Sequence, residues 1–147
     1  MRVVLDTNVL IRAANGIGSP AREIVDLCAT SPNSLLVSDL LLSELVRVMR
    51  YPRVRNIHRL SDVEIEDYVE EIRGIGELVE VPLMKVVTLS EDRDDDFVIH
   101  LACAGDADHL CTLDNHLRTK PVVDYCRASG IQVVTDIELL AALRKQS

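Results

Sequence analysis

The chain has 147 residues, the size of one domain with a single hydrophobic core. Its apolar content of 48% and charged content of 27% are typical of a soluble globular domain, and no apolar run approaches the roughly 20 residues that cross a bilayer. The net charge of −8 argues against a protein that coats nucleic acid through bulk attraction. The first residues contain no apolar signal segment. We therefore expect one cytoplasmic domain over residues 1–147 with no membrane segment.

Short apolar runs alternate with helical patterns along the chain. The runs predict strands at 3–5, 35–37, 78–81, 109–112 and 131–134. Ser19 before Pro20 is typical of an N-cap, and the capping boxes at 61–64 and 135–138 each begin a further helix. Helices are expected over about 20–30, 39–50, 62–73, 94–104 and 122–128, and from 136 to the C-terminal region. Five alternations of strand and helix predict an α/β fold with three layers, α/β/α, around a five-stranded parallel sheet.

Acidic residues fall where such a fold gathers its ligands, outside the carboxyl ends of the strands. Asp6 directly follows the first strand, and Asp114 comes two residues after Thr112, which ends the fourth. The run Asp94-Asp95-Asp96 begins a helix, where the helix dipole alone would favour one or two acids. Glu44 lies at the edge of the apolar face of its helix, so it either reaches solvent or serves a site. The spacing indicates a carboxylate cluster.

Converging carboxylates repel one another, and a divalent cation removes that conflict. Ligation by oxygen alone is what Mg²⁺ and Mn²⁺ prefer, and a cation held in this way can polarise a phosphodiester and activate a water. The sequence offers no competing Gly-rich phosphate loop or HExxH helix. The cysteines and histidines match no standard zinc spacing, so we expect buried, reduced thiols at Cys28, Cys103, Cys111 and Cys126.

A basic stretch between Arg47 and Arg59 contains no acid. It is either a solvated helix end and loop or a phosphate-contacting patch in an otherwise acidic molecule. The candidates for RNA contact in it are Arg47, Arg50, Arg53 and Arg55.

The motifs together resemble PIN domains, and among them the VapC-type toxins of toxin–antitoxin pairs. The resemblance spans nearly the whole chain and rests on residues 3–10 (VVLDTNVL), 43–45 (SEL), 94–108 (from DDDF to AGDAD) and 112–114 (TLD). The DTN motif and the later block are specific only in combination.

The resemblance implies a PIN-like five-stranded parallel sheet and a Mg²⁺- or Mn²⁺-dependent ribonuclease that is held inactive by a small antitoxin. It maps the catalytic and metal-binding acids to Asp6, Glu44, Asp96 and Asp114. It maps supporting residues to Asn8 and Thr112, and leaves Asp94 or Asp95 able to supply part of the third position. Homodimerisation is expected from the family and from the apolar helix 97–104, although the sheet and its neighbours alone could bury that helix.

Two other functions compete with the nuclease. A PIN-like fold could bind RNA or a protein without cutting. A phosphatase of the haloacid dehalogenase type would need a second Asp two residues after Asp6, and that position is Asn8.

Overall fold

The computed structural model describes residues 1–16, 18–82 and 96–146. Its centre is a five-stranded sheet in the order β3-β2-β1-β4-β5, in which every strand pair is parallel. This confirms the predicted α/β fold. The strands are β1 (Arg2–Leu5), β2 (Ser34–Val37), β3 (Glu77–Leu78), β4 (His109–Cys111) and β5 (Gln132–Val134).

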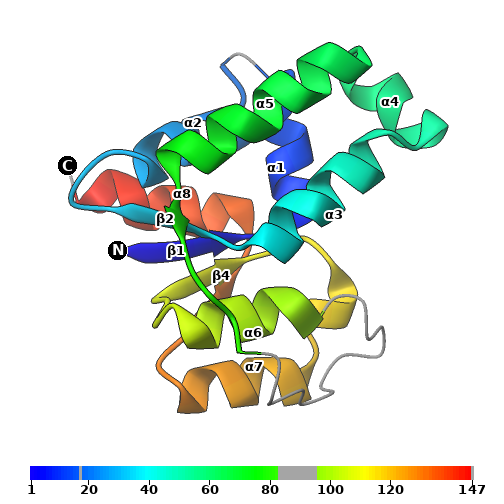
Figure 1. Cartoon of the computed structure of the whole chain (residues 1–147). Coiled ribbons are helices and arrows are strands. Elements are labelled where there is room, and N and C mark those ends of the chain that lie inside the picture. The colour runs from blue at the N-terminus through cyan, green and yellow to red at the C-terminus, as the bar shows by residue number, and fades with distance from the viewer. Residues whose placement is uncertain (17, 83–95, 147) are drawn as a thin grey trace.

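Helices cover both faces of the sheet (Figure 1). From β1 the chain moves outward to β2 and β3, then returns to form β4 on the other side of β1. Crossovers between parallel strands are right-handed. Connecting helices therefore lie on opposite faces of the sheet when the chain moves across it in opposite directions. On one face lie α1 (Thr7–Ala14), α2 (Pro20–Cys28), α3 (Asp39–Met49), α5 (Asp62–Ile75) and α8 (Asp136–Lys145), and on the other α6 (Asp96–Ala104) and α7 (Lys120–Ala128).

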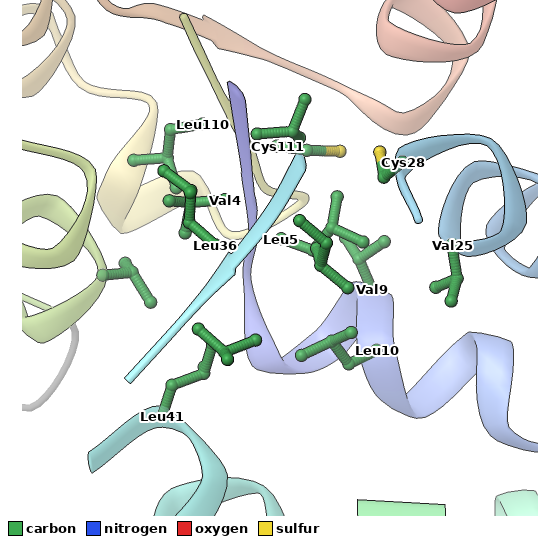
Figure 2. Packing of buried hydrophobic residues seen from close by; sticks show 14 of the residues in the cluster. Val4, Leu5, Val9, Leu10, Val25, Cys28, Leu36, Leu41, Leu110 and Cys111 are labelled. Atoms are coloured by element: carbon green, nitrogen blue, oxygen red, sulfur yellow. The ribbon is translucent and has the colours of Figure 1, made fainter. Parts of the chain in front are cut away.

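The core divides into two layers because neighbouring strand residues point to opposite faces. The register pairs Val4 with Leu110 and Leu5 with Cys111. Figure 2 shows Val4 and Leu110 on the α6 side of the sheet, while Leu5 and Cys111 lie on the side of Cys28 in α2. All five are fully buried. Complete burial of the valine and the two leucines among them contributes about 1.5–3 kcal/mol each.

Two helices were absent from the sequence-based prediction. Helix α1 begins directly after Asp6, with no loop between strand and helix, and α4 (Pro52–His58) follows α3 after a short break at Arg50 and Tyr51. Both are short, and their amphipathic patterns are brief. Strand β3 is also shorter than the predicted 78–81 and begins one residue earlier.

Helix α6 is buried on several sides, as predicted from its composition. Val98, Ile99, Leu101 and Ala102 are all fully buried. The cysteines are free thiols, and Cys103 is half-buried while the other three are buried. No helix in the described part of the chain is long and apolar enough to span a membrane.

Candidate functional site

The topological switch point lies between β1 and β4, where connections leave in opposite directions. At such a point the loops diverge and open a crevice at the carboxyl ends of the strands. Asp6 is the first residue after β1, and its backbone N–H donates to the carbonyl of Cys111 at the end of β4, at 2.9 Å. This bond fixes Asp6 beside the neighbouring strand, at the edge where the sequence predicted the site.

Thr112 connects the two acids at this crevice. Its hydroxyl donates to Asp6 Oδ2 at 2.8 Å and accepts from the backbone N–H of Asp114 at 3.0 Å. Thr112 is fully buried, and its own N–H donates to Val134 O of β5 at 3.0 Å. The sheet therefore holds the hydroxyl between Asp6 and Asp114. That Thr112 supports a reaction at this site stays a prediction.

Both acids also cap the helices that follow them. Asp6 Oδ1 accepts from Thr7 N at 2.7 Å at the start of α1. Asp114 Oδ1 accepts from His116 N at 2.9 Å at the start of the 3₁₀ helix Asn115–Leu117, while its Oδ2 accepts no hydrogen bond from the residues described. Each carboxylate thus keeps lone pairs available to a further partner.

The charge of Asp6 is unfavourable in this environment. Asp6 is only 6% exposed. Burial raises the pKa of the carboxyl, hydrogen bonds from Thr112 and Thr7 lower it, and the nearby Asp114 raises it further, so that the net shift is upward. A neutral Ser or Asn would cap α1 equally well without this cost. The fold therefore does not need a charged carboxylate at this position.

Asp96 is the first described residue of α6 and is only 3% exposed. A carboxylate at a helix N-terminus interacts favourably with the helix dipole. Asp94 and the predicted supporting residue Asp95 lie outside the described residues, so their share in the third acidic position stays a prediction.

Glu44 lies on α3 and is partly exposed, as its place at the edge of the apolar face predicted. It is paired with Arg47 of the next turn, at 2.5 Å between Oε2 and Nη2 and 3.2 Å between Oε1 and Nε. Arg47 also donates to the Tyr51 hydroxyl and lies over its ring. Glu44 therefore has a cationic partner already, which a metal ion would have to replace.

The structure brings Asp6, Thr112 and Asp114 together. Across residues 1–16, 18–82 and 96–146, no three His, Cys, Asp or Glu side chains are grouped so that they could hold a metal ion. Convergence of all four predicted acids on one cation stays a prediction. The donors at the switch point fit Mg²⁺ or Mn²⁺ in kind, because they are carboxylate oxygens with excess negative charge.

The basic stretch forms the end of α3 and the whole of α4. Arg50 pairs with Glu66 at 3.1 Å and Arg55 with Asp62 at 2.6 Å, so acids of α5 partly neutralise it. Arg53 is exposed and forms no ion pair within the described residues. Of the four candidates for RNA contact, Arg53 is thus the one whose charge no described acid neutralises.

His58, inside the same stretch, is buried. Its Nδ1 accepts from Leu60 N at 2.9 Å, and its Nε2 lies 2.8 Å from the Met49 carbonyl. This ring ties α4 to the end of α3, and both of its nitrogens lie at backbone groups.

Helix α1 adds a feature that the sequence analysis missed. Asn8 and Arg12 are one turn apart on its exposed side, and neither side chain forms a hydrogen bond or ion pair with the rest of the described chain. The apolar spacing of Val9, Leu10 and Ala13 after a capping Asp could have revealed this helix. Arg12 would then have joined Asn8 as a candidate beside Asp6.

Comparison with known proteins gives one family. Residues 2–116 match the PIN domain, a span that contains β1 to β4 and all of the predicted acids. A search of curated proteins finds no match. The match covers most of the chain and includes the switch point at Asp6 and Asp114, so this protein belongs to the PIN domain family.

Proposed function

We propose that this PIN domain is a Mg²⁺- or Mn²⁺-dependent endoribonuclease that hydrolyses RNA phosphodiester bonds, and that it is the toxin of a toxin–antitoxin pair. The observation that carries the nuclease is the buried Asp6 carboxylate, which Thr112 connects to Asp114 at the switch point. The raised pKa of Asp6 supports a cation there, because a divalent ion offsets the cost of charge that the fold does not need.

Asp6 and Asp114 would hold the cation, joined by Asp96 and Glu44 as further oxygen donors. When bound, the cation supplies a Lewis acid that polarises the scissile phosphodiester. Thr112 keeps the Asp6 carboxylate in a single orientation by donating to Oδ2. The hydrogen bond that the Asp6 backbone N–H donates to the Cys111 carbonyl holds the same residue at the crevice.

The acidic molecule must still attract RNA. Arg53 on α4 and Arg12 on α1 supply positive charge that no described acid neutralises. Each phosphate contacted by such a cation releases counterions, which favours binding at low salt.

A second candidate function is a PIN-like module that binds RNA or a protein without cutting. The observation in its favour is that Glu44 is already held by Arg47. If Glu44 never leaves that pair, the site has fewer ligands for the cation.

The substitution Asp6→Asn tests the proposal. The amide is nearly isosteric but lacks the charge that binds the cation. Cleavage of a structured RNA should fall by more than the roughly 10–100-fold that loss of an outer partner of a metal ligand costs. The variant should stay folded, and in chelator it should be at least as stable as the wild type at neutral pH, because a costly buried charge is gone.

Two controls are needed. One is the wild type in excess chelator, and the other is the wild type with a small phosphate ester as its substrate. Asp6→Asn cutting at the wild-type rate, or activity that survives chelation, contradicts the metal nuclease. RNA bound but not cut by the wild type supports the binding module, and turnover of the small ester supports a phosphatase.

The toxin role needs a separate experiment. Expression of the wild type in a bacterial host should arrest growth, while Asp6→Asn should not. Co-expression with the product of the neighbouring gene should restore growth if that product is the small antitoxin. Full growth under wild-type expression, with active nuclease present in the cells, contradicts the toxin role and leaves the nuclease intact.

A further inference from the structure

A pocket of about 340 Å³ opens between α1, α4 and the segment after β4. This volume falls within the range of about 300–1,000 Å³ that small-ligand sites occupy. It is lined by Asn8, Ile11, Arg12, Val54, Ile57 and Leu113.

The pocket adjoins the acidic site through two of its walls. Asn8 comes two residues after Asp6, in the first turn of α1, and Leu113 stands between Thr112 and Asp114. A molecule whose one end reaches the switch point can therefore place its neighbouring group in the pocket.

The lining combines apolar walls with two polar groups. Ile57 is 67% exposed and places an apolar surface at the pocket. The amide of Asn8 offers a donor and an acceptor, and the guanidinium of Arg12 offers charge. Neither polar group is engaged by another part of the described chain.

A nucleotide matches this combination. A nucleobase has apolar faces that aliphatic side chains can cover, and polar edges that an amide can recognise in both directions. Its phosphate suits a free guanidinium, which also binds base faces. An apolar side chain of a protein partner would use the walls but leave Asn8 and Arg12 without a role.

We propose that this pocket holds one unpaired nucleobase of the RNA substrate, next to the phosphate that is cut. The inference rests on the proposed nuclease function. Because a base within a duplex cannot enter the pocket, the enzyme selects single-stranded segments and loops. Ile57 and Asn8 are then determinants of specificity, and Arg12 contacts the backbone.

The test combines a protein variant with a substrate variant. The wild type first cuts a single-stranded RNA oligonucleotide, and the cut is mapped. A series of oligonucleotides then carries one abasic position each, on either side of the cut. One such position should raise the wild-type KM about tenfold, or about 1.4 kcal/mol, which is the free energy of removing roughly 55 Å² of apolar surface from water.

Ile57→Ser should raise the KM of the intact oligonucleotide by a similar factor. The KM of this variant should not rise further when the same position is abasic. The matched control is Ile137→Ser, which replaces another exposed isoleucine, 75% exposed on α8 and outside the pocket. This control should behave as the wild type does.

The inference is overturned if no single abasic position matters, or if Ile57→Ser is as sensitive to it as the wild type. Wild-type RNA affinity in Ile57→Ser would also overturn it, because Ile57 would then contribute nothing to RNA binding. If the wild type binds RNA but does not cut it, the nuclease proposal fails separately. The Kd of each oligonucleotide in the same series is then measured by fluorescence anisotropy. Absence of all RNA binding overturns both.

Discussion

Thr112→Val is the substitution that most directly probes how the fold holds the acidic site. Valine has nearly the shape of threonine but no hydroxyl. The change removes the bond to Asp6 Oδ2 at 2.8 Å and the bond from Asp114 N at 3.0 Å, both at a position with no exposure to solvent.

The expected loss of stability follows from these two bonds. A hydrogen bond to a charged group contributes about 1.5–3 kcal/mol and a neutral one about 1 kcal/mol. The additional buried methyl group offsets up to about 0.8 kcal/mol. Thr112→Val should therefore lower the free energy of unfolding by about 2–3 kcal/mol, or the Tm by roughly 5–10 °C for a domain of this size.

The pH dependence of stability, measured in chelator, gives a second readout. The pKa of Asp6 is raised in the folded state, so the folded protein binds more protons than the unfolded chain between the two pKa values. Stability therefore falls as pH rises from the unfolded value, near 3.8, through the folded pKa, and stays lower above it. Because the Thr112 hydrogen bond lowers that pKa, Thr112→Val should extend the fall to higher pH.

Thr112→Ser is the matched control, because it keeps the hydroxyl and loses only a methyl group. Differential scanning calorimetry across pH, with RNA cleavage under added Mn²⁺, measures both properties. If Thr112→Val matches Thr112→Ser in stability, in its pH profile and in cleavage rate, the hydroxyl does not position Asp6.

Three further predictions follow from the surface of the molecule. Arg53→Ala should weaken RNA binding and reduce the slope of log affinity against log salt by about 1. Arg55→Ala should change this slope less, because Arg55 is paired with Asp62. Equal slopes for the two variants in a salt titration would contradict this assignment. Ser61→Ala removes the hydroxyl that accepts from Glu64 N at 3.2 Å in the capping box. The free energy of unfolding in urea should fall by about 1 kcal/mol, and RNA cleavage should not change. An unchanged urea midpoint would show that the cap is not needed. The chain should sediment as a homodimer at micromolar concentration and moderate salt, and a monomeric mass would exclude that assembly.

Much of the fold could be predicted because local patterns in this chain agree with the tertiary structure. The strand runs around Val4, Leu36 and Leu110 are apolar on consecutive residues because both faces of the sheet are covered. The capping boxes at Ser61 and Thr135 form with both of their reciprocal hydrogen bonds. Such signals lie within a few residues of one another and need no knowledge of distant contacts.

The positions of Asp6 and Asp114 were also within reach of the sequence. Parallel strands all end at the same edge of a sheet, so an acid placed just after a strand lies at that edge whatever the order of the strands. Thr112 could be proposed as a supporting residue from its place beside Asp114, but its bond to Asp6 joins residues 106 positions apart.

Pairing between distant segments was decided only by the tertiary structure. The basic stretch has no acid of its own, and Asp62 and Glu66 partly neutralise it because α5 folds back along α3. The pocket beside the acids likewise needs Ile57 of α4 to meet Arg12 of α1. Charge pairs and cavities depend on which surfaces pack together, and that arrangement minimises the free energy of the whole chain, which no local pattern encodes.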